Sequence, residues 1–438
     1  MARGRTPLTT CARTRVATKA FPAAELIVGS PLGISRARIG WLCFEGLRVL
    51  VFLLVSTFAH FLAARWVLSV FPWARARRRL VYRVAGALAL ALATLRVLGW
   101  VFRGWVFFHD LLAIAMIELA VVVIALAPLG LVIAALRAVA RAFDRVVPPT
   151  DDRAKDARIS RREAIERVAG VSIASATTAV LGWGMVRGRH AFALEEVPIA
   201  IRGWPKALDG YVIAQVSDIH VGAFVGDREL DEGFELVRRV KPDLVVATGD
   251  LVDIDADLIG ALLTRLLGAN ARDGAYAILG NHDHYADPVE VGRAIRSSKV
   301  KLLSNEAARI RPNDGGGFAL LGVDDLQGRR LPDHGYTGPD LGRALAGLPP
   351  DLPRILLAHQ PRFFLESQGR VSLQLSGHTH GGQINPGFRP AAAFMEFVAG
   401  RYDRGGSTLY VNRGYGVTGP PARVAAAPEV TKLVIVSA

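Results

Sequence analysis

The sequence predicts an α/β fold for the second half of the chain, preceded by an α-helical transmembrane region in the first half. Hydrophobic residues make up 51% of the 438 residues, and the mean hydropathy of +0.30 is higher than in ordinary soluble proteins. Apolar residues form long runs before residue 140, but short runs separated by helical stretches and glycine-rich turns after residue 205. A chain of this length can hold both parts.

All the excess positive charge lies in the first half. Residues 1–190 hold 27 Lys and Arg against 10 Asp and Glu (+17), whereas residues 191–438 hold 26 against 29 (−3), which gives the net charge of +14. Arginines beside hydrophobic runs are typical of topology signals and of contacts with membrane lipids. The second half lacks the basic surface that long nucleic acids require, so we expect no long nucleic acid as a partner.

The first half divides into a tail and three apolar stretches. Residues 1–40 are rich in arginine and contain no long apolar run, so we expect a disordered basic tail. In the region 41–140, the stretches 42–64, 80–102 and 105–136 are each long enough to cross about 30 Å of hydrocarbon. A buried helical core is the alternative, but three such runs favour about three transmembrane helices.

Residues 141–190 are predicted to be a linker followed by a fourth apolar helix. Arg161 and Arg162 precede the weakly apolar run 168–186, and this order resembles a twin-arginine export signal. The motif is internal, and it has Ala164 where an aromatic residue is more common. A plain fourth membrane helix with an arginine flank is an equal alternative. Either interpretation places the second half across the membrane from these arginines.

The arginines also predict the side of the membrane. The positive-inside rule makes the arginine-rich loop 65–79 and the linker before residue 165 cytoplasmic. The basic tail opposes this topology, because three helices would leave it outside unless the first run does not span. Two short loops beside helices should outweigh a tail. We therefore expect a multi-pass cell-membrane protein with an extracytoplasmic second half.

Short β-rich apolar runs in the second half are predicted to be buried strands. A helix is predicted at residues 227–240, with Leu230, Phe234 and Val237 on one face and Pro242 beyond its end. The predicted strands are 211–216, 244–247, 275–279, 318–323, 355–358 and 373–375.

A polar motif directly follows five of these strands, so its side chains should converge at one edge of a sheet. Glycines at 249, 280 and 377 allow sharp turns and a close approach to an ion. One motif alone would be weak evidence, because Gly-Asp and Gly-Asn are usually turns and a lone histidine is usually structural. The motifs are Asp218-Ile219-His220, Gly249-Asp250, Gly280-Asn281-His282-Asp283, His359 and Gly377-His378-Thr379-His380.

The motif side chains offer only nitrogen and oxygen to a metal. Both cysteines, Cys11 and Cys43, precede the predicted domain, which excludes a thiolate site within it. Ligation by nitrogen and oxygen suits Mn²⁺, Fe or Zn²⁺ more than Cu⁺.

This set of motifs resembles the calcineurin-like metallophosphoesterases, whose pattern D-x-H, G-D, G-N-H-[DE], H and G-H-x-H the chain matches without a gap. The resemblance covers about residues 210–438 of a domain predicted at 205–438. It implies a four-layer α-β-β-α sandwich, with two mixed sheets face to face and two divalent metal ions (Mn, Fe or Zn). It assigns Asp218, His220, Asp250 and His380 to one ion, and Asp250, Asn281, His359 and His378 to the other.

Asp250 would bridge the two ions. A carboxylate can bridge through its two oxygens, whereas a neutral imidazole or an amide serves one ion. The resemblance also makes His282 the catalytic group that stabilises the transition state or protonates the leaving oxygen, and Asp253 the catalytic partner that keeps His282 charged. A turn or helix N-cap is the alternative for Asp253. Asp283 and His284 are expected behind the metal-binding residues or at the surface.

The implied reaction is hydrolysis of a phosphodiester, pyrophosphate or phosphomonoester bond by a metal-bridging hydroxide. Protein phosphatases continue the second motif as G-D-x-x-D-R-G, but Ile254 and Asp255 follow Asp253, which disfavours a phosphoprotein substrate. Residues 377–384 and 410–414 resemble the membrane-associated bacterial branch, which includes enzymes related to UDP-2,3-diacylglucosamine hydrolase and exported cell-envelope phosphodiesterases. This favours a lipid-linked or envelope substrate.

Two alternative functions remain from the sequence. A nucleotide phosphodiesterase or nuclease could use the same dinuclear site, but the acidic balance of the second half opposes long polyanions. A non-catalytic membrane receptor could keep the fold, but such proteins usually lose metal ligands, and none is missing. Arg413 is a candidate phosphate contact, with an ordinary surface arginine as the alternative. The sequence does not predict an oligomeric state.

Overall fold

The structure is a computed structural model that describes residues 54, 56–101, 131–132, 135, 138, 161–313, 316–330, 335–385 and 387–438. Contacts divide the chain into Met1–Val51 and Phe52–Ala438, and every described residue belongs to the second unit. The predicted tail and most of the predicted helices at 42–64 and 105–136 lie outside the described residues.

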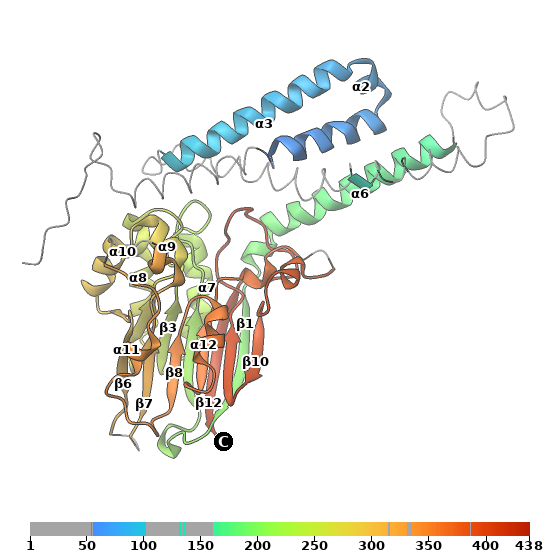
Figure 1. The fold of residues 1–438 in the computed structure, drawn as a ribbon. Helices are drawn as coiled ribbons and strands as arrows, with labels where there is room; N and C mark the ends of the chain where they lie inside the picture. The colour runs from blue at the N-terminus through green and yellow to red at the C-terminus, as the bar shows by residue number, and fades with distance from the viewer. Residues whose placement is uncertain are drawn as a thin grey trace, which may run out of the picture. The chain divides into compact units, whose positions relative to one another are not determined.

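Helices make up the described residues before position 187. Residues 56–70 are helical, followed by α2 (Pro72–Ala76), α3 (Arg78–Val101) and, later in the chain, α6 (Arg161–Val186) (Figure 1). Residues 80–101 of the predicted apolar stretch 80–102, and the whole of the stretch 168–186, are therefore helical. In the part of the chain that the structure describes, however, none of the helices combines the length and apolarity needed to cross a membrane.

The transmembrane prediction thus has no support from α3 and α6. Arg83 and Arg96 interrupt the apolar sequence of α3, and serine, threonine and glycine interrupt that of α6. The twin-arginine resemblance at the start of α6 stays a prediction.

Two mixed six-stranded sheets form the domain that follows (Figure 1). The first sheet has the order β1-β12-β2-β3-β4-β5. Strands β2 to β5 run parallel to one another, and β12 runs antiparallel to β2 and parallel to β1. Its strands are β1 (Ala193–Ile201), β2 (Tyr211–Val216), β3 (Leu244–Thr248), β4 (Ala275–Ile278), β5 (Lys301–Leu302) and β12 (Glu429–Ser437).

The second sheet has the order β10-β11-β9-β8-β7-β6. Its four central strands are parallel, and the two edge strands are antiparallel to their neighbours. Its strands are β6 (Glu306–Ile310), β7 (Phe318–Gly322), β8 (Arg354–Leu357), β9 (Leu373–Ser376), β10 (Gly400–Arg404) and β11 (Ser407–Val411).

Apolar side chains fill three layers around these sheets. Ile213, Val246 and Leu357 belong to the core between the sheets. The outer face of the first sheet packs against α7 (Asp227–Val240), α8 (Ile259–Gly268) and α10 (Pro288–Arg296), and that of the second against α11 (Leu341–Leu345) and α12 (Phe364–Ser367). Central strands buried on both faces explain the continuous apolar runs of the sequence. The α/β prediction with two mixed sheets is confirmed.

Element boundaries follow the predictions closely where burial is complete. Strand β2 and helix α7 have the predicted limits, and the other five predicted strands differ by one residue at one or both ends. Strand β1 lies before the predicted domain start at 205, yet it pairs with β12 over nine residues. Its alternating exposure and its Pro198 are typical of an edge strand, which carries a weaker sequence signal.

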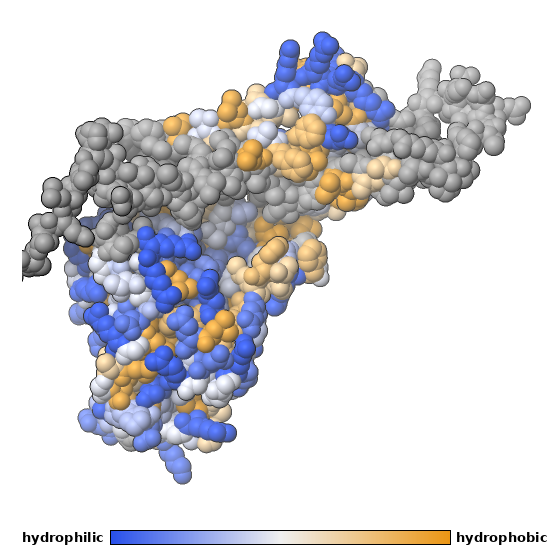
Figure 2. Space-filling view, in the orientation of Figure 1, coloured by the Kyte–Doolittle hydropathy of each residue, from blue (hydrophilic) through white to orange (hydrophobic). Residues whose placement is uncertain are grey.

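The surface differs between the two described parts. In Figure 2 the visible face of the two-sheet domain is largely hydrophilic, whereas hydrophobic side chains are prominent on the helices that precede it in the chain. Leu80, Leu88 and Leu90 on α3, for example, are about half exposed or more.

Candidate metal centre

The motif residues come together at the carboxyl ends of strands from both sheets. The loops after β2, β3 and β4 supply the first three motifs, and the loops after β8 and β9 supply the other two. The buried Gln215 joins the sheets beneath them, because its Nε2 donates to Thr248 Oγ1 and to the Ser376 carbonyl, both at 3.0 Å. We expected convergence at one edge of a single sheet; instead, two sheets placed face to face contribute.

Five of the seven predicted metal-binding residues have left-handed backbone conformations. Their φ angles lie between 50° and 72°, a region that costs non-glycine residues roughly 1–3 kcal/mol each. Such strain persists only where the surroundings hold the residue in place, and it concentrates at functional sites. These residues are Asp218, His220, Asp250, His378 and His380.

The three motif glycines are needed mainly for space. Of the three, only Gly249, with φ of 88°, has a left-handed conformation. A Cβ on Gly280 would collide with Asp250 Oδ1, and a Cβ on Gly377 would collide with Asp218 Oδ2. These two glycines therefore let neighbouring loops approach the carboxylates.

The first group of donor atoms consists of Asp218, His220 and His380. Their donor atoms lie within 4.8 Å of one another, and all three residues are buried. The Nε2 atoms of His220 and His380 face each other at 3.1 Å, and His380 Nε2 is 3.5 Å from Asp218 Oδ1. The backbone N–H of His378 donates to both oxygens of Asp218, at 2.8 and 2.9 Å, which fixes the carboxylate.

The second group consists of Asp250, His359 and His378, with Asn281 at the start of α9 (Asn281–Ala286). His359 Nδ1 donates to the Thr248 carbonyl at 2.8 Å, which leaves the lone pair of Nε2 free. Three buried atoms here have no hydrogen-bond partner in the described chain: His359 Nε2, His378 Nδ1 and Asn281 Oδ1. Buried polar atoms are normally satisfied, so orphaned acceptors that belong to one site indicate a bound cation.

Asp250 lies between the two groups. Its Oδ1 accepts the backbone N–H of His282 at 2.8 Å. Its Oδ2 is 3.6 Å from His220 Nε2 in the first group and 3.2 Å from His359 Nε2 in the second. The sequence suggested bridging through both oxygens. That mode of bridging stays a prediction; in the structure Oδ2 is the oxygen that lies near a histidine of each group, and Oδ1 accepts one backbone N–H.

The charges at the site suit cations. Burial alone would raise the pKa of Asp250, but the neighbouring histidines, His359 foremost, hold it well below its usual range. Burial alone would lower the pKa of His359, whereas the negative charge of Asp250, whose Oδ2 is 3.2 Å from Nε2, raises it well above its usual range. Burial and the nearby His359 lower the pKa of His378 to about 4. Asp250 thus requires positive charge beside it, while other imidazoles stay neutral, as metal binding requires.

His282 and Asp253 form a pair beside the donor groups. His282 Nδ1 is 3.0 Å from Asp253 Oδ1 and 3.1 Å from the Asp253 carbonyl. Burial alone would lower the pKa of His282, but the charge of Asp250 and the hydrogen bond to Asp253 raise it to about 9. The His282 side chain is 21% exposed, whereas that of His359 is fully buried. A ring nitrogen of His282 also lies within 4.8 Å of donor atoms of His220 and Asp250.

The alternative roles of the acidic residues are resolved by their contacts. Asp255, not Asp253, caps the short helix η5 (Ala256–Leu258) by accepting the N–H of Asp257 at 3.0 Å. Asp283 is fully buried and accepts backbone N–H groups from Gly280 and from the loop after Asp250, so it is not a surface residue.

Three further residues lie close to the site but do not belong to either group of metal-binding residues. His284 is buried, with its Nε2 2.9 Å from Asp324 Oδ1. Arg413 does not fit a phosphate contact, since its guanidinium pairs with Glu195 at 2.6 Å and Glu429 at 2.8 Å. No sequence signal selects Arg423, which is buried with Nη2 3.1 Å from His380 Nδ1. It follows two prolines in a loop, a context typical of a surface arginine.

Known proteins share this arrangement of motifs. A model of the calcineurin-like phosphoesterase family matches residues 211–382, which contain every predicted metal-binding residue. The chain is 34% identical over 272 residues to a transmembrane protein with metallophosphoesterase domain from Bos taurus, over 60% of the chain and 61% of that protein. It is 32% identical over 285 residues to the metallophosphoesterase YkuE of Bacillus subtilis, over 63% of the chain and 96% of that protein.

Among solved structures, that of a dimetal phosphatase from Danio rerio is similar over 47% of this chain and 88% of the phosphatase chain, with a TM-score of 0.32 and 14% sequence identity. The assignment of the chain to a family rests on these sequence relatives and not on the structural similarity. The chain spans 61% of the length of the Bos taurus protein. The family fold uses two divalent metal ions, and the aspartate and histidine groups described above could hold them. The chain belongs to the calcineurin-like metallophosphoesterase family.

Proposed function

We propose that the protein is a dinuclear metal-dependent hydrolase of phosphoric esters. The observation that carries this proposal is the position of Asp250 Oδ2 between one histidine of each donor group. A shared carboxylate oxygen flanked by two sets of nitrogen and oxygen donors suits two neighbouring cations. The set for one ion is Asp218, His220, Asp250 and His380, and the set for the other is Asp250, Asn281, His359 and His378.

The chemistry divides between the ions and the chain. When bound, two divalent ions lower the pKa of a shared water and stabilise charge on the phosphate oxygens. The chain's own residues orient those donors: the Thr248 carbonyl fixes the tautomer of His359, and the His378 N–H fixes the Asp218 carboxylate. Hydrogen bonds of this kind around metal-binding side chains typically raise metal affinity and activity.

His282 is the proposed acid for the leaving oxygen. Asp253 holds its Nδ1 from two sides, through Oδ1 and the carbonyl, so the opposite nitrogen, Nε2, is left for the substrate. A histidine held in one orientation and kept protonated by a carboxylate can donate a proton in the transition state. The partial exposure of its side chain makes it accessible to a substrate.

His282→Ala should lower the rate of hydrolysis by ~10²–10⁴-fold, the range of general acid catalysis, while the protein keeps its metals. The loss should shrink for substrates with good leaving groups such as p-nitrophenol, because these need little protonation. Steady-state rates and elemental analysis on the same preparations measure both effects. Asp253→Asn should show a weaker version of the same defect.

An equal loss for good and poor leaving groups would contradict the acid role and indicate a positioning role. Loss of one metal ion in His282→Ala would instead make His282 a metal ligand, as its proximity to His220 and Asp250 allows. His190→Ala is a suitable control, because His190 pairs with Glu232 outside the site.

We infer a lipid-linked or envelope phosphoester as the substrate from an apolar segment attached to the last motif. The segment runs from Gly387 to Phe397 and includes η10 (Pro390–Ala393). Asn385 Nδ2 donates to the Gly381 carbonyl at 3.0 Å at its start, and Thr379 Oγ1 donates to the Val398 carbonyl at 2.5 Å at its end. Both anchors belong to the turn that carries the last two histidines.

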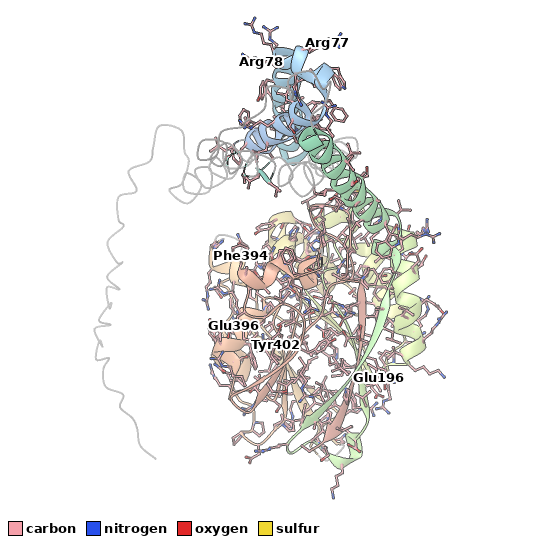
Figure 3. All side chains as sticks on the ribbon, turned by 90° about the vertical axis from the view of Figure 1, so that its right-hand side faces the viewer. Arg77, Arg78, Glu196, Phe394, Glu396 and Tyr402 are labelled. Carbon is pink, nitrogen blue, oxygen red and sulfur yellow. The ribbon has the colours of Figure 1, made fainter. Side chains whose placement is uncertain are left out.

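Most side chains of this segment face solvent, whereas Phe397 at its end is buried. Phe394 is 90% exposed and Phe388 is 66% exposed, and Figure 3 shows Phe394 at the outside of the domain. Large exposed apolar side chains beside a candidate active site favour a partner with hydrocarbon. A nucleotide substrate is the second candidate, because an aromatic ring can stack on a base.

Phe394→Ser should lower activity on a phosphodiester presented in lipid micelles by about five-fold relative to activity on bis-p-nitrophenyl phosphate. This corresponds to ~1 kcal/mol from partial burial of the ring against lipid. Leu365→Ser, at a position 46% exposed on α12, is the matched control. An unchanged ratio for Phe394→Ser, or a selective loss with nucleotide diesters, would contradict the lipid assignment.

We also infer a multi-pass membrane protein with its catalytic domain outside the cytoplasm. The support is the arginine-rich segment 65–79, which is helical apart from the breaks on either side of α2, the arginine-rich linker before residue 165, and the transmembrane designation of the Bos taurus relative. Alkaline phosphatase, which is active only after export, should be active when fused after Ala191. An inactive fusion together with an active cytoplasmic reporter at the same junction would place the domain in the cytoplasm.

A further inference from the structure

The charged side chains of the helices at residues 56–101 are all positive. This segment contains seven arginines and no aspartate or glutamate. Five of the arginines lie within residues 75–83, where α2 meets α3. Figure 3 shows Arg77 and Arg78 at the tip of this helical segment. Clustered cations repel one another, so a bound anion would stabilise them.

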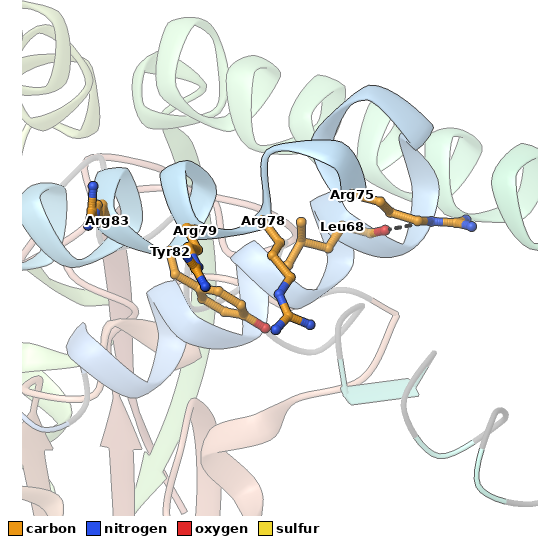
Figure 4. Close-up of a pocket in the computed structure, with 6 residues that line it drawn as sticks. All are labelled: Leu68, Arg75, Arg78, Arg79, Tyr82 and Arg83. Atoms are coloured by element: carbon orange, nitrogen blue, oxygen red, sulfur yellow. Dashed lines mark hydrogen bonds between the residues drawn. The ribbon is translucent and has the colours of Figure 1, made fainter.

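A pocket of about 730 Å³ lies at this junction, and Arg75, Arg78, Arg79 and Arg83 line it together with Leu68 and Tyr82 (Figure 4). Arg75 is held in place, since its Nε donates to the Leu68 carbonyl at 3.0 Å and its Nη2 to the Ser69 carbonyl at 2.9 Å. Within the described residues, the guanidinium groups of Arg78, Arg79 and Arg83 form neither an ion pair nor a hydrogen bond.

Helical spacing places these groups on a common side. Residues three and four apart are neighbours on a helix surface, so Arg78 and Arg79 both lie next to Tyr82, and Arg79 also lies next to Arg83. Guanidinium groups present several N–H donors in a planar arrangement that matches phosphate oxygens. The pocket thus has the chemistry of a phosphate site.

The surroundings of the pocket are apolar. Phe58 and Trp73 are about 60% exposed, and Leu80 and Leu90 on α3 are more than half exposed. Figure 2 shows hydrophilic side chains at the tip and hydrophobic ones along the same helices. Cations at one end, with Trp and Tyr beside them and exposed aliphatic side chains further along, match the layers of a bilayer surface.

We propose that the pocket between α2 and α3 binds the phosphate headgroup of an anionic phospholipid, with the adjacent apolar side chains against its acyl chains. A soluble anion would account for the arginines but not for the exposed apolar residues around them. Only a lipid supplies phosphate and hydrocarbon together. This binding site is independent of the hydrolytic reaction.

The test uses the full chain in neutral detergent and fluorescent phosphatidylglycerol in mixed micelles, with phosphatidylcholine of the same acyl chains as reference. The wild type should bind phosphatidylglycerol more tightly, and added salt should reduce the difference. The double variant Arg78→Gln/Arg79→Gln should weaken phosphatidylglycerol binding by about 30-fold, which is ~2 kcal/mol at roughly 1 kcal/mol per cation. Its binding of phosphatidylcholine should not change.

The matched control is Arg238→Gln/Arg239→Gln, which removes the same charge from exposed positions on α7. An equal loss in this control would overturn the proposal, since net charge alone would then explain binding. Equal binding of both lipids by the wild type would also overturn it. Displacement of the lipid by millimolar inorganic phosphate would show a site for free phosphate instead. Circular dichroism and metal content of each variant exclude misfolding.

Discussion

The contact between the buried Asp250 carboxylate and the histidines around it is the constraint on which the rest of the site depends. A carboxylate removed from water is costly unless positive charge compensates it. Here Oδ2 is within 3.2–3.6 Å of imidazole nitrogens from two donor groups, while Oδ1 is held by a backbone N–H. His359 Nε2 and Asn281 Oδ1 are buried acceptors without a hydrogen-bond partner in the described chain, and bound cations would satisfy them. Two divalent ions would satisfy all of them together.

The fold meets this constraint by using the ends of two sheets. Strands β2, β3 and β4 bring one set of loops, and β8 and β9 bring the other, while Gln215 links the two beneath the site. Left-handed backbone at Asp218 and Asp250 turns their carboxylates inward, and Gly280 and Gly377 leave the space they need. The strain in the loops is supported by a core buried on both faces of each sheet.

The sequence predicted what local patterns encode. Burial on both faces produced the continuous apolar run of β2, and polar motifs at strand ends located the site before any geometry was known. Features that depend on distant parts of the chain were out of reach. Arg423 contacts His380 across 43 positions, and Asp250 Oδ1 accepts the N–H of His282 from α9, 32 positions away. Predicted transmembrane helices rested on hydropathy alone, and the described helices do not support them.

Counting metal ions is the most direct test of a dinuclear centre built around Asp250. The metal-free full chain would be dialysed to equilibrium against Mn²⁺ or Zn²⁺ and the bound metal measured by elemental analysis. We predict two ions per chain, fewer in Asp250→Asn, and two again in Asp257→Asn, an exposed aspartate outside the site. Fewer than two ions in the wild type, or two ions retained in Asp250→Asn, would contradict it.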